Sequence, residues 1–154
     1  MYVRILVPVD GSPTSNRGLD EAIALAKLTG ARLRLIHVVD DIGYLITAGQ
    51  GAGYSGDILG ALRDGGEAIL AQTKAQVDKA GVPVDTVIYE DLQGTLADRV
   101  VAEAIDWKAD LIVIGTRGRR GATRLLLGSD AEQILRLAPV PVLLVRTPES
   151  SQKA

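Results

Sequence analysis

Residues 115–129 form a glycine- and arginine-rich segment that combines the residue types suited to phosphate binding. Glycines let backbone N–H groups approach an anion closely, and the dipole of a following helix favours negative charge at its start. Ser129 would place a hydroxyl donor at the cap of that helix. Charge-assisted contacts to phosphate could come from the arginines of the segment, which are Arg117, Arg119, Arg120 and Arg124. We therefore interpret the segment as a candidate phosphate-binding loop; glycines that serve turn geometry alone are the alternative.

This loop is not of the Walker A type, because the chain contains no Gly-Lys-Ser or Gly-Lys-Thr sequence. Residues 51–56 do match the dinucleotide pattern Gly-x-Gly-x-x-Gly, but they lie well beyond the second expected strand and not in a tight turn between strand and helix. We expect a flap there, over a ligand site or a partner surface.

Asp10 follows the first apolar run and is the second candidate for ligand binding. Its carboxylate could contact a ligand, or it could hold a turn with Gly11 and Ser12. His37 is the only histidine, and with no cysteine in the chain a zinc site is not expected. We interpret His37 as a packed strand residue, with a general base as the alternative. The spacing shows no Ser/His/Asp or paired-carboxylate arrangement, so no catalytic residue and no metal ligand is predicted.

The composition argues against several functional classes. The absence of cysteine excludes disulfide scaffolds and thiol chemistry. A net charge of −2 provides no basic field to attract nucleic acid, and the Arg117–Arg124 cluster has no interleaved aromatic residues. The apolar run Ile5–Val9 is far too short for a signal or transmembrane segment. We expect a cytoplasmic protein without a nucleic-acid partner or membrane insertion.

Regular elements must hold the candidate residues in place, and apolar runs alternate with helical patterns along the chain. The runs expected to be strands are residues 3–9, 33–39, 84–89, 111–114 and 139–145. Helices are expected from Pro13, capped by Ser12, to a stop at Gly30, then over residues 57–80, after Thr95, and over residues 129–137. This alternation predicts a single three-layer α/β/α domain around a five-stranded parallel sheet.

The sequence also predicts a break or kink in one helix and the buried face of another. Gly65 and Gly66 fall inside the helix at residues 57–80, and because each glycine costs about 1 kcal/mol relative to alanine, the pair predicts a break or kink. The helix after Thr95 is expected to bury the apolar positions Leu96, Val100, Val101, Ala104 and Ile105. Trp107 at its end is expected to pack against the core.

Periodicity does not give the strand order, and we expect 3-2-1-4-5, the order common among Rossmann-like and flavodoxin-like sheets. Strands one and four are then neighbours at the topological switch point, where ligands bind beyond the carboxyl ends of the strands. The loops at residues 10–12 and 115–129 follow these two strands. The last strand would be an edge, and its apolar residues Val140–Val145 would invite pairing with another chain. We therefore expect a homodimer through Val140–Val145.

Four sequence words together resemble the universal stress protein family. They are residues 5–12 (ILVPVDGS), residues 109–115 (ADLIVIG), the spacing Gly115-x2-Gly118-x9-Gly128-Ser129, and residues 138–145 (APVPVLLV). The resemblance covers residues 1–146, which we expect to be the domain, with residues 147–154 as a flexible tail. It implies a small cytoplasmic α/β protein that forms homodimers and is linked to stress survival.

The same resemblance implies nucleotide binding, because the glycine spacing marks the members of the family that bind ATP. Gly115, Gly118, Gly128 and Ser129 would hold the ribose and phosphates, Asp10 would face the adenosine, and the backbone of Val38 would border the adenine. The full candidate site is Asp10, Gly11, Ser12, Val38, Gly115, Thr116, Arg117, Gly118, Arg119, Gly128, Ser129 and Asp130.

Asp130 departs from the family pattern, in which a small apolar residue follows the motif serine. A carboxylate there suits the helix dipole but repels phosphates. The leading hypothesis is a binding module for ATP or another adenine nucleotide with Mg²⁺, which hydrolyses ATP slowly at most and acts on an unidentified protein partner. The alternatives are a dimer that binds no nucleotide, and a hydrolase or phosphotransferase that uses Asp10 or Asp130.

Overall fold

The computed structural model describes residues 1–39, 56–90, 94–116 and 127–147, with the backbone alone for residues 56–59. Within these ranges the strands are β1 (Arg4–Pro8), β2 (Arg32–Val38), β3 (Val84–Tyr89), β4 (Leu111–Gly115) and β5 (Val142–Val145). All neighbouring strands pair in parallel, in the order β3-β2-β1-β4-β5. The expected sheet and its strand order are confirmed.

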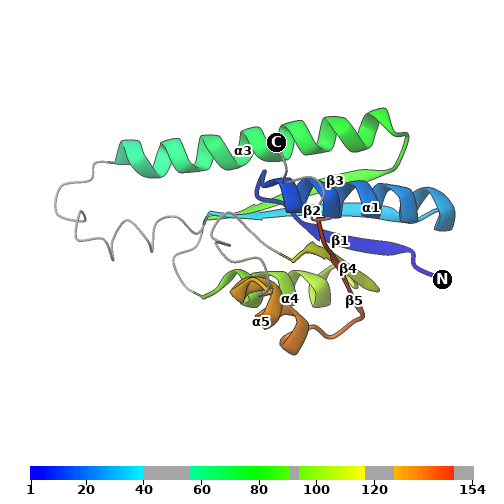
Figure 1. Ribbon diagram of the computed structural model, residues 1–154. Helices are drawn as coiled ribbons and strands as arrows, with labels where there is room; N and C mark the ends of the chain where they lie inside the picture. Colours follow the sequence, from blue (N-terminus) through cyan, green and yellow to red (C-terminus); the bar gives the residue numbers. More distant parts are fainter. Residues whose placement is uncertain (40–55, 91–93, 117–126, 148–154) are drawn as a thin grey trace.

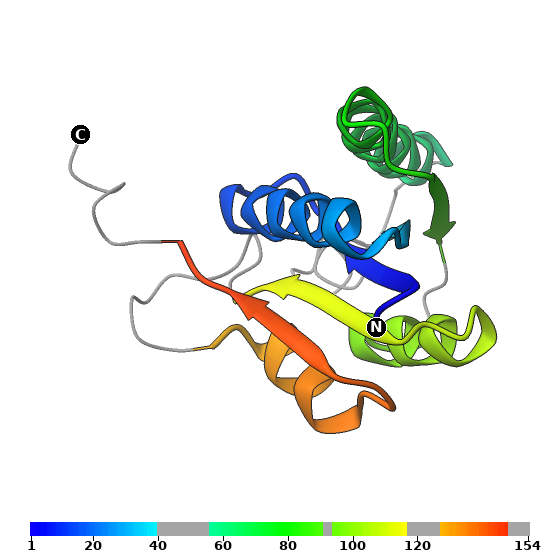
Figure 2. The ribbon, with the colours of Figure 1, turned by 90° about the vertical axis from the view of Figure 1, so that its right-hand side faces the viewer.

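Helices cover both faces of this sheet. The described helices are α1 (Pro13–Thr29), α3 (Gly56–Lys79), α4 (Leu96–Asp106) and α5 (Ser129–Leu137). Figures 1 and 2 show α1 and α3 on one face of the sheet and α4 and α5 on the other. The fold is therefore the three-layer α/β/α arrangement that the alternating pattern predicts.

Side chains that alternate along the strands fill two cores. Ile5 and Val7 of β1 belong to the core under α1 and α3, whereas Leu6 belongs to the core under α4 and α5. Because successive side chains of a strand point to opposite faces, a strand covered on both faces reads as one continuous apolar run. This is why β1 and β4 were recognisable in the sequence.

Local capping sets the ends of α1 as expected. The hydroxyl oxygen of Ser12 accepts a hydrogen bond from the Ser15 N–H, and Pro13 occupies the first helical position. Gly30 ends the helix with a φ of 73°, a left-handed conformation that glycine adopts without strain.

The predicted break at Gly65 and Gly66 is wrong, since α3 is one continuous helix from Gly56 to Lys79. Leu70 and Val77 bury one face of α3 against the sheet. Burying each side chain of this size stabilises by about 1.5–3 kcal/mol, which offsets the roughly 2 kcal/mol propensity cost of two glycines.

The buried face of α4 also differs from expectation. Ile105 is 59% exposed, while Glu103 is 5% exposed. Glu103 is buried because it accepts hydrogen bonds from Arg34 at 2.7 Å and from the Tyr89 hydroxyl at 2.5 Å. Trp107 packs against the core under α4 and α5 as predicted, and the Arg34 guanidinium lies 4.7 Å from the centre of its ring.

None of the helices that the structure describes is long and apolar enough to span a lipid bilayer. Of the expected tail, residues 147–154, all but Thr147 lie outside the described ranges.

Candidate functional site

The carboxyl ends of β1 and β4 lie next to each other, and each leads toward the start of a helix. The two strands pair at Ile5↔Leu111 and Leu6↔Ile112. α1 begins at Pro13, just beyond β1, and α5 begins at Ser129, after the glycine-rich loop that follows β4. The topology therefore places the residues that follow β1 beside the first residues that follow β4, as Figure 1 shows for the strands and helices.

The segment after β1 is a tight, internally bonded turn. A carboxylate oxygen of Asp10 accepts a hydrogen bond from the Ser12 N–H at 2.8 Å, and the Asp10 N–H donates to the Ser15 hydroxyl at 3.2 Å. Gly11 between them has a φ of 77°, which glycine adopts readily. The turn interpretation of Asp10 is confirmed, and its contact with a ligand stays a prediction.

Ser15 is a residue of this turn that the sequence analysis missed. It is buried, and it bonds both Asp10 and Ser12. Its position three residues after the helix cap is the signal that could have revealed it, because a cap side chain bonds the backbone at that spacing.

Gly115, at the end of β4, packs directly against the first turn of α1. A Cβ atom at Gly115 would lie 2.6 Å from the carbonyl oxygen of Thr14. One turn further along α1, a Cβ at Gly18 would lie 3.2 Å from the Gly115 nitrogen. This glycine of the candidate motif therefore has a packing role of its own, which fixes the start of α1 beside the end of β4.

The two ends of the glycine-rich loop are joined by a backbone hydrogen bond. The Gly128 N–H donates to the Thr116 carbonyl oxygen at 2.8 Å, and the Thr116 N–H donates to Val145 of β5 at 3.0 Å. The start of α5 is thereby held at the carboxyl end of β4. Three predicted site residues between these ends, Arg117, Gly118 and Arg119, lie outside the described residues.

The helix cap of α5 differs from the prediction. Gly128, and not Ser129, is the N-cap residue, and among the described residues no side chain bonds the cap. Ser129 is the first helical residue and is exposed. Because the first N–H groups of a helix have no partner within it, this end of α5 presents backbone donors and a positive dipole end. Asp130 and Glu132 follow in the same turn, and both acids suit that dipole.

Val38 lies at the carboxyl end of β2, the neighbour of β1. The preceding residue, His37, is buried and is hydrogen-bonded through Nδ1 to the carbonyl oxygen of Val9 at 2.8 Å. This confirms the packed interpretation of the histidine. The general-base alternative is not tested by this contact, because Nε2 is the ring nitrogen that would act as the base when Nδ1 carries the proton.

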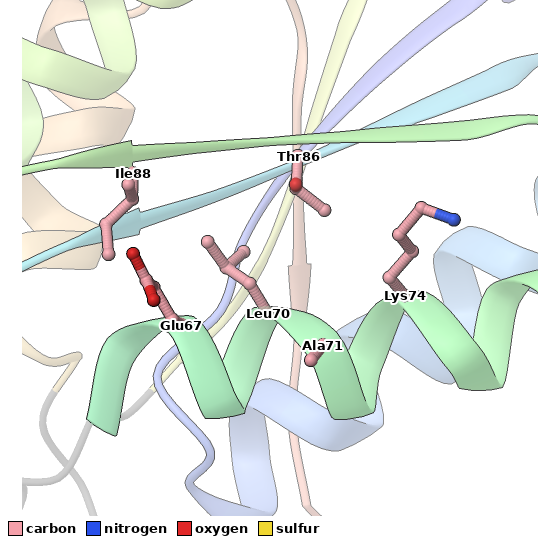
Figure 3. A pocket seen from close by; sticks show the side chains of 6 residues that line it. All are labelled: Glu67, Leu70, Ala71, Lys74, Thr86 and Ile88. Atoms are coloured by element: carbon pink, nitrogen blue, oxygen red, sulfur yellow. The ribbon is translucent and has the colours of Figure 1, made fainter. Parts of the chain in front are cut away.

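A separate cavity of about 370 Å³ lies between α3 and β3 (Figure 3). Leu70, Ala71 and Ile88 form its apolar wall, and Glu67 and Lys74 stand on α3 at its rim. None of the site residues predicted from the sequence lines it, so the cavity is not part of the candidate site. Across the described ranges, no group of three His, Asp or Glu side chains could hold a metal ion.

The model of the universal stress protein family matches residues 1–146. A universal stress protein of Methanocaldococcus jannaschii is 36% identical over 150 residues, with 97% of this chain and 85% of that protein covered. A crystal structure of a protein of the family from Burkholderia pseudomallei is 33% identical, with 93% and 95% of the two chains covered and a TM-score of 0.71.

Another solved structure is that of a universal stress protein in complex with cAMP. It is 26% identical to this chain, covers 96% of it and 98% of its own length, and has a TM-score of 0.65. The family match over almost the whole chain agrees with the strand order and with the glycine spacing that follows β4. The chain belongs to the universal stress protein family.

Proposed function

We propose that this protein binds an adenine nucleotide, ATP as its magnesium complex, at the carboxyl ends of β1 and β4. The observation that carries the proposal is the hydrogen bond between Thr116 and Gly128, which holds the start of α5 beside the end of β4. Backbone N–H groups and a positive dipole end at a topological switch point are suited to phosphates. The relative in complex with cAMP supports an adenine nucleotide as the ligand.

Different residues of the site would contact different parts of the nucleotide. Gly118, Gly128 and Ser129 would contact the ribose and phosphates, with Thr116, Arg117 and Arg119 beside them. Asp10, with Gly11 and Ser12, would face the adenosine, and the backbone of Val38 would border the adenine. Gly115 would contribute chiefly by letting α1 pack closely on β4.

Magnesium would enter with the nucleotide, bound to its phosphates. The described residues contain no carboxylate cluster that could hold the ion without them. We expect ATP hydrolysis to be slow at most, because the sequence offers no evident base or water-positioning residue.

Nucleotide occupancy would change the loop between Thr116 and Gly128 and thereby the recognition of a protein partner in a stress response. We also propose a homodimer through Val140–Val145 and a cytoplasmic location, both on the resemblance to the family. β5 is an edge of the described sheet, and Leu143 on it is 39% exposed, which supports pairing with a second copy.

A dimer that binds no nucleotide is the second candidate. It is favoured by one observation, the half-buried Asp130 in the first turn of α5. A carboxylate at that place would repel a phosphate that approaches the helix end, although it stabilises the helix itself.

Thermal unfolding with and without nucleotide tests the proposal. At about 100 times its dissociation constant a ligand adds roughly 2.7 kcal/mol per site, and for a chain of this length the transition should rise by roughly 5–10 °C. Mg-ATP or AMP should produce this shift, and GTP should not. A Gly118→Val variant should unfold like the wild type without ligand and lose the shift. Absence of any shift, with no copurified nucleotide, would favour the second candidate.

A further inference from the structure

The backbone ladder between β1 and β2 ends one hydrogen bond early. Arg32 N–H donates to Val3 O and Val9 N–H donates to Ile36 O, so the even-numbered residues of β2 turn their backbone groups toward β1. Regular continuation of a parallel ladder would bring the Val38 N–H to the Val9 carbonyl oxygen. That bond is not formed.

The side chain of His37 takes the place of this bond. Its Nδ1 atom lies 2.8 Å from the Val9 carbonyl oxygen, and because a carbonyl oxygen can only accept, Nδ1 carries the proton. The Val9 oxygen is thereby satisfied without the Val38 amide. Among the described residues, no backbone or side-chain group accepts from the Val38 N–H, which faces the β1 side of the sheet at its carboxyl edge.

The imidazole ring is held in this position by Gly66 of α3. A Cβ atom at Gly66 would lie 2.6 Å from Cδ2 and 2.9 Å from Nε2 of His37, and 3.1 Å from Cδ1 of Ile88. Ile88 is paired in register with His37, and Figure 3 shows it pointing from β3 toward α3 beside Glu67. Only a glycine at position 66 leaves room for the ring. At the neighbouring Gly65, a Cβ would meet nothing within 4 Å.

From this geometry we propose that His37 is a positioning residue for the nucleotide site, which ends the β1–β2 ladder so that the Val38 backbone N–H is left for the adenine. The inference rests on the proposed function for the identity of the ligand. Gly66 is the second part of the arrangement, since it provides the space for the ring. An adenine ring carries acceptor nitrogens on its edge, and a backbone N–H is a donor suited to them.

Two variants of His37 separate the role of its N–H donor from that of its bulk. His37→Leu removes the donor and lets the Val38 N–H pair with Val9 O, so the dissociation constant for AMP should rise at least tenfold. His37→Asn places an amide N–H near the position of Nδ1 and should retain most of the affinity. Calorimetric titration with AMP measures all three proteins, and circular dichroism with thermal unfolding shows that each is folded.

The two glycines of α3 form a matched pair for the same assay. Gly66→Ala should displace the ring and weaken AMP binding about as much as His37→Leu does. Gly65→Ala should leave the affinity unchanged and raise stability through its better helix propensity. In the His37→Asn background, where the ring is absent, Gly66→Ala should have little further effect, and this non-additivity marks the contact between the two residues.

NMR of the nucleotide-free protein tests the arrangement of His37 and Val38 independently of ligand binding. Because His37 is the only histidine, its ring gives a single set of NMR signals. The wild type should show a protonated Nδ1 with slow solvent exchange, lost in Gly66→Ala and kept in Gly65→Ala. The Val38 amide should exchange faster in the wild type than in His37→Leu.

The outcomes are distinguishable. A wild type that binds no adenine nucleotide overturns the proposed function. A wild type that binds AMP, together with a His37→Leu variant of equal affinity, overturns the role of His37 alone. An unprotonated Nδ1, or a Val38 amide as protected in the wild type as in His37→Leu, overturns the ladder arrangement whatever the ligand result.

Discussion

The space that a side chain at Gly115 would occupy is filled by the backbone of Thr14: a Cβ there would lie 2.6 Å from the Thr14 carbonyl oxygen and 2.7 Å from its carbonyl carbon. Backbone atoms of a helix cannot move aside as the end of a flexible side chain can. The first glycine of the candidate motif thus sets the distance between α1 and β4, independently of any ligand.

Gly115→Ala should therefore lower the free energy of unfolding by about 1–3 kcal/mol, the usual cost of overpacking. Gly18→Ala is the comparison variant and should cost less. Its Cβ would lie 3.2 Å from the Gly115 nitrogen, a milder contact, and alanine has the better helix propensity. Urea denaturation of both variants measures the difference. A Gly115→Ala variant as stable as the wild type would contradict the packing role.

Tyr89 should make stability fall at alkaline pH. Its hydrogen bond to the Glu103 carboxylate, followed by burial, raises the pKa of the Tyr89 hydroxyl to about 12 from an ordinary value of about 10. Because the pKa is higher in the folded state, the contribution is complete below pH 10 and is lost as the pH rises toward 12. The free energy of unfolding of the wild type should fall more steeply over that interval than that of Tyr89→Phe. Parallel curves for the two proteins would exclude this contribution.

A charged side chain on the edge strand β5 should dissociate the proposed dimer into monomers. Leu143→Lys places a charged side chain on β5, which disfavours pairing with a second copy. Light scattering after gel filtration should give a dimer for the wild type and a monomer for this variant. Leu28→Lys is the control, since Leu28 is 85% exposed on α1 and a lysine there should leave the dimer intact. A wild type that is monomeric at all concentrations would refute the interface.

Removal of the carboxylate at position 130 should strengthen nucleotide binding. Asp130→Ala eliminates a negative charge from the first turn of α5, and the gain should be larger for ATP than for AMP because ATP carries more phosphate charge. The same change should cost about 0.3–1 kcal/mol of stability through the lost dipole interaction. Calorimetric titration gives the affinities and urea denaturation the stability. Equal affinities for the two proteins would show that Asp130 does not face the phosphates.

Local signals in the sequence were enough to predict most of the fold. Ser12, Pro13 and Gly30 mark the ends of α1 because capping depends on residues within one turn of each other. Continuous apolar runs reveal the doubly covered strands, and β3 has the predicted ends Val84 and Tyr89. The expected strand order correctly made β1 and β4 neighbours, and these are the strands that the two candidate segments follow.

Contacts between residues far apart in the chain decided the rest. The hydrophobic periodicity predicted a buried Ile105 and did not predict a buried Glu103. Periodicity depends on hydrophobicity alone, whereas Glu103 is buried because Arg34 and Tyr89 donate hydrogen bonds to its carboxylate. From helix propensity alone, Gly66 was predicted to break the helix. In the structure α3 is continuous, and the His37 ring packs against Gly66. The sequence by itself determined which segments become strands and helices, since those preferences are local. Only the tertiary structure decided which side chains share a volume, because that depends on distances between elements that no local pattern contains.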